Sequence, residues 1–454
     1  MLTSTAGVFG RVDFAAPLVV AAAIVGVGVL IALFAVPPHL LPAMAFLVMV
    51  VMPDRLLFLA PLEYFPPEVI IMFVWAVRKL LNVSTGRRTA VRTPVRASVI
   101  VLLMAALIWF IVVAISNTPA RSASWMVAFL VLLVFPLLLP DREREVDTLR
   151  RLWPWTGAVI SIYACVQAVI QTNPIYDPLY NNLRLVPIQH WSVFRADATL
   201  AHPLTAGLFF AMTLAFCVGR WVETSRRSFA ALALLNGLGV IATVSRGSYI
   251  AAGVAVAAVL LLALIAGQRF GRARIIAILG AFSVFGYFAL QSDSFQERSN
   301  SVDGLGSATA REDMWGITEA AASSYNWLGA GPGTSETAAI PFNWKGLPIE
   351  NSYFQLLISV GVPGLILFSL FLLSVYRVAI RERNLSAIGG LTAALVAIGG
   401  YAAIDGPRTA LGLLAFMILL TVSPIRANTD PDKPPQVSAR KGHRPLPTLR
   451  PVVR

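Results

Sequence analysis

The sequence predicts an all-α, polytopic membrane protein with about 12–13 transmembrane helices and one long extracytoplasmic loop carrying short helices. Three observations lead to this fold class. Of the 454 residues, 57% are hydrophobic and only 13% are charged, and the mean hydropathy is +0.73. Apolar stretches of membrane-spanning length recur along the chain, and basic residues gather in alternate loops between them. A soluble chain of this size could not bury so much apolar surface.

The apolar stretches define the expected membrane spans in order. A transmembrane helix needs about 20 predominantly apolar residues. The second and third stretches are shorter than this, so twelve spans fit as well as thirteen, and the side of the membrane on which the N-terminus lies stays open. The stretches cover residues 15–35, 39–52, 66–80, 97–116, 122–139, 152–170, 199–218, 229–244, 247–266, 275–290, 352–376, 386–404 and 409–425.

The charge distribution predicts which loops face the cytoplasm. Six alternate loops carry a net charge of +18, whereas the rest of the chain carries −5. Lysine and arginine mark cytoplasmic loops, so the basic balance reports topology and attraction to anionic membrane lipids. It does not indicate a nucleic-acid partner. The six loops are 77–96, 141–151, 220–228, 268–274, 377–384 and 426–454.

The same pattern divides the chain into regions. Residues 1–425 are expected to form the transmembrane domain, with extracytoplasmic loops at 171–198 and 292–349, and residues 426–454 a disordered, basic cytoplasmic tail. The cytoplasmic loops carry no nucleotide-binding signature. Both cysteines lie in predicted spans, and the four histidines have no metal-ligand spacing. We therefore expect chemistry at the outer face, with no cofactor and no metal.

Three arginines stand out on the acidic outer side. Arg246 lies between the apolar runs 229–244 and 247–266, with almost no loop to hold it, and a cation at that depth is costly. Arg195 precedes a span, and Arg311 opens a stretch of helical periodicity in the long loop. Guanidinium groups grip phosphate oxygens bidentately and stay charged, so three of them suit a phosphorylated lipid.

Each arginine also has a purely structural interpretation. Arg195 could pair with Asp197, Arg246 could anchor a helix end, and Arg311 could join a surface network with its acidic neighbours Glu312 and Asp313. The depth of Arg246 is the hardest to explain structurally.

Three further features near the expected outer face are open to two interpretations. The glycine-rich run 329–333 forms either a tight turn or, less often, a backbone cradle for an anion. Glu350 precedes a helix that Asn351 or Ser352 would cap, and it acts either on the helix dipole or as a general base. His202, before Pro203, is more often a satisfied interfacial histidine than a catalyst.

Taken together, these features resemble the O-antigen ligase and polysaccharide polymerase superfamily of bacterial membrane glycosyltransferases. The resemblance covers residues 180–376. The matching segments are Arg195 with His202-Pro203, Ser245-Arg246-Gly247-Ser248, Arg311 with Trp315, Gly331-Pro332-Gly333, Asn351-Ser352-Tyr353-Phe354-Gln355-Leu356-Leu357 and Gly361-Val362-Pro363-Gly364-Leu365.

The resemblance implies a metal-independent transfer of a glycan from undecaprenyl pyrophosphate to an acceptor hydroxyl, outside the cytoplasmic (inner) membrane. Arg246 would then be catalytic, and Arg195 and Arg311 would help it hold the pyrophosphate. Glu350 would act as the base, and His202, Asn351 and Tyr353 would bind the substrate. A chain-length regulator and a flippase are the candidate protein partners.

One position departs from the ligases of this family and favours a polymerase of repeat units. The ligases have a histidine immediately before the asparagine of the closing motif, where this chain has Glu350. An O-antigen ligase remains the alternative. A transporter of lipid-linked solutes ranks below both, because the spans are nearly free of mid-span charges. A purely structural membrane subunit ranks below the transporter, since it gives no reason for the outer arginines.

Overall fold

The computed structural model describes most of the predicted transmembrane domain. The described residues are 28, 31–57, 65–84, 95–139, 142–183, 185, 193–265, 272–291, 296–297, 302–405 and 408–423. Most of the first apolar stretch and the whole tail 426–454 lie outside them. Among the described residues every regular element is a helix, which confirms the all-α fold class.

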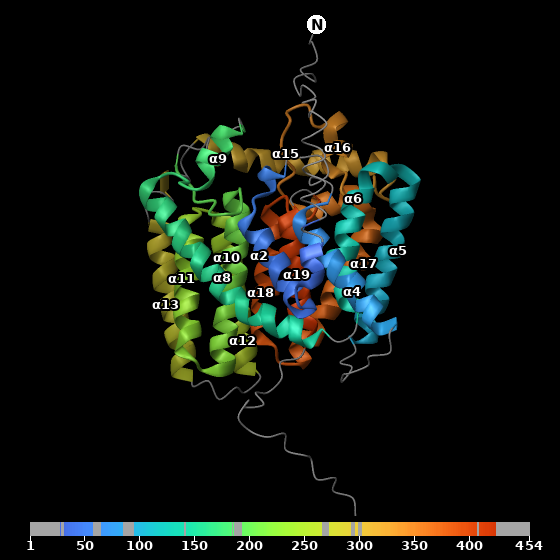
Figure 1. Ribbon diagram of the computed structural model, residues 1–454. Coiled ribbons are helices and arrows are strands. Elements are labelled where there is room, and N and C mark those ends of the chain that lie inside the picture. The colour runs from blue at the N-terminus through green and yellow to red at the C-terminus, as the bar shows by residue number, and fades with distance from the viewer. Residues whose placement is uncertain are drawn as a thin grey trace, which may run out of the picture. The chain divides into compact units, whose positions relative to one another are not determined.

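Each predicted apolar stretch from residue 39 onward contains a helix (Figure 1). The helices of the first half of the chain, inside and outside these stretches, are η1 Pro38–Leu40, α2 Leu41–Val51, η2 Asp54–Leu56, α4 Pro67–Ser84, α5 Ala97–Asn117, α6 Pro119–Phe129, η3 Leu130–Val134, α7 Phe135–Leu138, α8 Glu143–Ile170, α9 Tyr176–Asn182 and α10 Pro203–Thr224. Those of the second half are α11 Arg227–Ala242, α12 Arg246–Ile265, α13 Arg272–Gln291, α15 Val302–Ser324, α16 Ser335–Ala339, η4 Ile340–Phe342, α17 Ser352–Arg381, α18 Leu385–Ala397, η5 Ile398–Gly400 and α19 Arg408–Val422.

Six helices of the described chain are long and apolar enough to cross a membrane. They are α5, α6 continued through α7, α8, α10, α12 and α17; shorter apolar helices lie at residues 38–51, 227–242, 385–400 and 409–422. The protein is therefore a multi-pass membrane protein. The long loop departs from the expectation of short helices only, because α15 alone has 23 residues.

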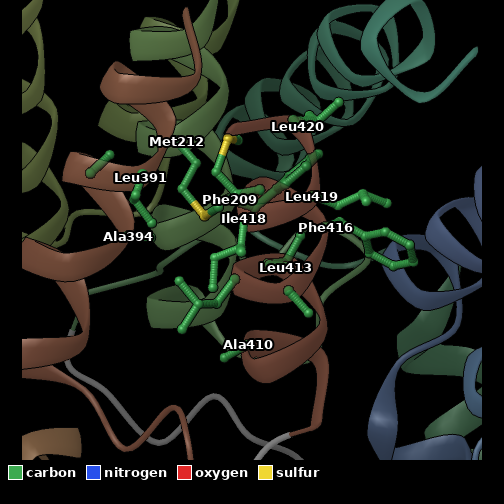
Figure 2. Packing of buried hydrophobic residues seen from close by; sticks show 14 of the residues in the cluster. Phe209, Met212, Leu391, Ala394, Ala410, Leu413, Phe416, Ile418, Leu419 and Leu420 are labelled. Atoms are coloured by element: carbon green, nitrogen blue, oxygen red, sulfur yellow. The ribbon is translucent and has the colours of Figure 1, made fainter. Parts of the chain in front are cut away.

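Helix α10 lies at the centre of the packing. It contacts α8, α11, α12, α18 and α19, and nearly all of its side chains are buried. Figure 2 shows Phe209 and Met212 of α10 meeting Leu391 of α18 and Ile418 of α19 in a close-packed apolar cluster. Such packing fixes the ends of these helices relative to one another.

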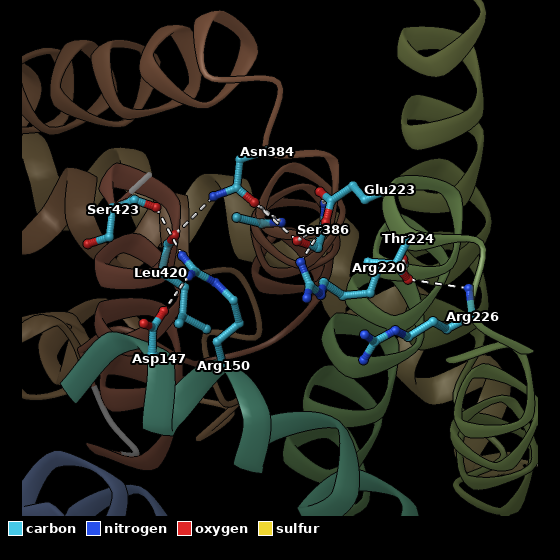
Figure 3. Close-up of polar contacts among 11 residues, drawn as sticks. Asp147, Arg150, Arg220, Glu223, Thr224, Arg226, Asn384, Ser386, Leu420 and Ser423 are labelled. Atoms are coloured by element: carbon cyan, nitrogen blue, oxygen red, sulfur yellow. Dashed lines mark hydrogen bonds and ion pairs between the residues drawn. The ribbon is translucent and has the colours of Figure 1, made fainter. Parts of the chain in front are cut away.

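A polar network joins the helices at the end that carries Glu223, here called the Glu223 end (Figure 3). The Glu223 carboxylate accepts a hydrogen bond from the Ser386 backbone N–H (2.8 Å) and pairs with Arg220 (3.0 Å). Asn384 donates to the Leu420 carbonyl (3.1 Å), and Arg150 donates to the Ser423 carbonyl (3.0 Å). Together these bonds hold α8, α10, α18 and α19.

Helix α17 is broken near its start. Gly361 has φ 68° and ψ −178°, a backbone conformation open essentially to glycine alone. The Ala330 N–H and the Gly331 N–H satisfy the freed carbonyls of Ile358 and Ser359, each at 2.8 Å. The loop that follows α15 therefore docks against the broken helix. In the view of Figure 1, α9, α15 and α16 lie at the same end of the helices.

Candidate functional site

The turn between α11 and α12 brings two of the predicted arginines together. The Ala196 N–H donates to the Ala242 carbonyl (3.0 Å), and the Arg195 Nε donates to the Thr243 carbonyl (3.2 Å). Arg246 is the first residue of α12, three residues beyond Thr243. Arg195 is buried, whereas Arg246 keeps partial exposure. Two positive charges thus lie at one helix junction.

A close approach of α10 and α12 fixes the position of Arg246. A Cβ atom on Gly207 of α10 would lie 2.0 Å from the Ser248 Oγ and 2.8 Å from its Cβ. Ser248 also donates to the Ser245 Oγ (2.9 Å), which closes the first turn of α12. The start of α12 is therefore held against the first turns of α10, next to His202.

His202 is the N-cap of α10, and its side chain accepts a hydrogen bond from the first turn of that helix. Its Nδ1 accepts the Leu204 N–H (3.1 Å), so the neutral ring carries its proton on Nε2. Burial, followed by the positive charges of Arg195 and Arg55, lowers the pKa of His202 to about 3. The imidazole is therefore uncharged at neutral pH and offers an N–H donor, which does not suit a general base.

Tyr401 links His202 to Glu350. The two rings of Tyr401 and His202 stack with centroids 5.6 Å apart, and the Tyr401 hydroxyl shares a hydrogen bond with Thr205 (2.5 Å). Burial raises the pKa of Tyr401, and the negative charges of Asp54 and Glu350 add to this effect. Glu350 thus lies within electrostatic reach of the ring that covers His202. This end of the helices is here called the Glu350 end.

Asn351 and Tyr353 have structural partners. The Asn351 Oδ1 accepts the N–H groups of Tyr353 (2.9 Å) and Phe354 (3.3 Å), which confirms the expected helix cap of α17. The Tyr353 hydroxyl donates to the Leu395 carbonyl (2.7 Å). Both bonds set the direction of α17, and with it the position of Glu350 one residue before the cap.

Arg311 lies in α15, and its side chain is outside the described residues. Four residues on, the Trp315 ring packs on Phe354 of α17, with centroids 5.5 Å apart. The acidic neighbour Asp313 pairs with Lys345 (2.5 Å). Helix α15 is thus held against the first turn of α17, close in the chain to Glu350.

The glycine-rich run forms a turn next to which backbone N–H groups bind a carboxylate of the protein itself, that of Asp405. Gly329, Gly331 and Gly333 all have positive φ. The Gly333 N–H (2.7 Å) and the Ser335 N–H (2.8 Å) donate to the Asp405 carboxylate, which also accepts from the Ser359 hydroxyl. Burial raises the pKa of Asp405, and these hydrogen bonds oppose the rise. These hydrogen bonds therefore connect the long loop to the segment after α18.

Sequence reasoning missed three residues at this end. Arg55 satisfies the criterion that singled out the other arginines, because it also lies outside the basic loops. Asp405 is an acidic residue in a short turn between apolar stretches, and this position could have marked it as a candidate. Tyr401 gave none, since its role depends on contacts with residues about 200 positions away.

In the part of the chain that the structure describes, no group of three or more His, Cys, Asp or Glu residues could hold a metal ion. Residues 230–369 match a protein-family model described as O-antigen ligase. This segment is an O-antigen ligase family domain, which confirms the resemblance and implies a glycan-transferring membrane enzyme that acts on lipid-linked glycans. It contains Arg246, Arg311, Glu350, Asn351 and Tyr353, whereas Arg195 and His202 precede it. No curated protein matches the chain.

Proposed function

We propose, on the premise that residues 230–369 form an O-antigen ligase family domain, that this protein polymerises repeat units of an exopolysaccharide or O-antigen-type glycan. The donor is a glycan carried on undecaprenyl pyrophosphate, and the reaction takes place at the outer face of the cytoplasmic membrane. The alternative is a ligase that transfers the finished glycan to a lipid or another acceptor. The two reactions share the donor and the chemistry, and they differ in the acceptor.

The observation that carries the proposal is the hydrogen bond from Arg195 to the Thr243 carbonyl at the junction of α11 and α12, three residues before Arg246. In the transfer, the acceptor oxygen bonds to the anomeric carbon while the bond from that carbon to the pyrophosphate breaks. Negative charge then develops on the departing pyrophosphate, and paired guanidinium groups stabilise it. Arg311 is the third candidate, since it lies on α15, which packs against the first turn of α17 through Trp315.

Glu350 is the candidate base of this reaction. It lies at the same end, next to the capped start of α17, and its charge reaches Tyr401. Glu350 would take the proton of the acceptor hydroxyl as the new glycosidic bond forms. His202 cannot fill this role, because its Nδ1 accepts the Leu204 N–H and its Nε2 carries the proton. It would instead donate to a substrate oxygen.

The first experiment tests the leaving-group role of Arg246. Arg246→Ala and Arg246→Lys are both expected to reduce glycan transfer severely, at near-normal protein levels. Lysine keeps the charge but loses the planar fork, so bidentate binding of phosphate predicts that it fails to rescue. The measurement is transfer from a purified lipid-linked donor by protein reconstituted in vesicles.

Arg227→Ala is the matched control, because Arg227 is the first residue of α11 and lies at the Glu223 end. It should transfer as the wild type does. Full activity of Arg246→Lys would show that the position needs only a positive charge, and the bidentate role would be wrong.

The second experiment tests Glu350 and separates polymerase from ligase. Glu350→Gln keeps the shape and leaves the Asn351 cap intact, so a loss of about 10²–10⁴ in rate would report lost basicity. Cells that carry this variant should accumulate single lipid-linked repeat units. Glu336→Gln is the matched control, since Glu336 is an exposed carboxylate of α16. Long, unattached lipid-linked chains would instead identify a ligase.

A further inference from the structure

Arg55 lies at the Glu350 end in a turn that is fixed on three sides. The carbonyls of Val50 and Val51, at the end of α2, accept hydrogen bonds from the Thr199 hydroxyl and the Tyr176 hydroxyl, each at 2.5 Å. The neighbour Asp54 accepts from the Thr409 hydroxyl (2.8 Å). The η2 turn is therefore joined to α9, to the segment before α10 and to α19.

The side chain of Arg55 is exposed, in contrast to that of Arg195. Its positive charge acts on Tyr180, Asp197 and His202. Arg55 thus belongs to the surroundings of His202, to which Arg195 also contributes. A guanidinium on a rigid turn loses little conformational freedom when it binds an anionic ligand.

The acidic residue of this group is held by its own partners. Asp197 is buried and accepts a hydrogen bond from Asn173 (2.9 Å). Burial raises the pKa of Asp197 to about 6, and the Asn173 bond and the Arg55 charge oppose the rise. Asn173 is fixed in turn by the Tyr163 hydroxyl (2.5 Å). The carboxylate is therefore held in place within electrostatic reach of Arg55.

One buried hydroxyl of this group lacks a hydrogen-bond partner. The Tyr180 hydroxyl is buried and has no hydrogen-bond partner within the described chain. The charges of Asp197 and Arg55 both act on it. Buried hydroxyl groups are almost always satisfied, so a water molecule or a bound ligand is expected to place an oxygen or nitrogen atom here.

We propose that Arg55 and Tyr180 form a binding subsite for an anionic oxygen of the lipid-linked glycan, carried by its pyrophosphate or by the carboxylate of an acidic sugar. The inference rests on the proposed function, since it deepens the description of the same donor. Arg55 binds the anionic group directly. Tyr180 donates its hydroxyl to the same group once the donor is bound.

The test compares four forms of the protein: wild type, Arg55→Gln, Tyr180→Phe and the double variant. The charged hydrogen bond predicts a KM for the donor raised roughly 10- to 100-fold in Arg55→Gln, with a much smaller change in kcat. If both residues bind one group, the double variant should be little worse than Arg55→Gln alone. Arg121→Gln is the matched control, because Arg121 is an exposed arginine at the start of α6, next to the residues that bond the glycine-rich run.

Two donors and one binding assay identify the source of the anion. If the pyrophosphate is the ligand, Arg55→Gln weakens binding of undecaprenyl pyrophosphate without a glycan, and both neutral and acidic glycan donors are affected. If an acidic sugar is the ligand, only the donor that contains a uronic acid is affected. Either result supports the subsite.

The proposal is overturned if Arg55→Gln stays within twofold of Arg121→Gln on both donors and in the binding assay. If Arg55→Gln folds poorly, Arg55→Lys takes its place, because lysine keeps the charge of an exposed side chain. The KM for the donor should still rise, since lysine lacks the planar guanidinium. Wild-type protein that transfers no lipid-linked glycan would contradict the proposed function itself. Binding of undecaprenyl pyrophosphate by wild type and variant would still test the subsite in that case.

Discussion

Single side chains at the Glu350 end combine a local structural role with a place in the candidate site. His202 caps α10 through Nδ1, and this bond decides which of its nitrogens carries the proton. Asn351 caps α17 and thereby places Glu350. The cap of α17 was predictable from the residue types before an apolar run. The proton state of His202 was not, because it depends on burial and on the charges of Arg195 and of Arg55, and Arg55 is distant in the chain.

The two roles of His202 can be separated by substitution. His202→Asn keeps an acceptor for the Leu204 N–H, since asparagine is a favourable N-cap, so stability should change by less than about 1 kcal/mol. Transfer should fall, because the Nε2–H donor is lost. Thermal unfolding in detergent and the transfer assay measure the two effects. Normal transfer by this variant would limit His202 to the cap.

At the scale of helices, the decisive feature is the break in α17. The segment from Gly361 to Gly364 was predicted to lie inside one continuous span of residues 352–376, because apolar periodicity does not reveal a single non-helical residue. The break persists because the Trp327 carbonyl receives the Val362 N–H (2.9 Å) and the Trp109 indole donates to the Val360 carbonyl (2.8 Å). These partners are distant in the chain, which is why the sequence did not reveal them.

Substitution of Gly361 should release the docked loop. Alanine there would adopt a strained backbone, at a cost of about 1–3 kcal/mol, and its Cβ would lie 2.4 Å from the Trp327 carbonyl oxygen. Gly361→Ala is expected to lower thermal stability and to expose residues 326–333 to protease. Gly253→Ala in α12 is the control, because a Cβ there meets nothing within 4 Å. Equal protease resistance of the two variants would contradict the docking.

At the scale of the whole protein, charge and hydrophobicity predicted the fold class and the positions of the helices. They could not predict which loop residues meet. Asp405 and Gly333 are 72 residues apart, and their bond depends on how α17 and the segment after α18 pack. The candidate residues were therefore found as separate motifs, and their order in space came from tertiary contacts.

The predicted topology can be tested directly. After replacement of Cys165 and Cys217, a cysteine at position 307 should react with a membrane-impermeant reagent in intact cells, because the long loop is expected outside. A cysteine at position 438 should react only after lysis, since basic segments mark the cytoplasmic side. The opposite labelling pattern would place Glu350 and Arg246 in the cytoplasm and contradict the proposed function.

The network at the Glu223 end has a mechanical consequence. A Cβ on Gly219 would lie 2.4 Å from the Ser386 Cα, so α10 and α18 touch there backbone to backbone, and Glu223 bonds the same residue. The two backbones also approach at Gly389, where a Cβ would lie 2.7 Å from the Ala215 carbonyl oxygen. The start of α10, which His202 caps, lies about 25 Å from Gly219, so a tilt of about 10° about the Gly219 contact moves it by about 4 Å. A rotation that admits a bulky lipid-linked chain can therefore be small, while the Glu223 end of the core keeps its packing.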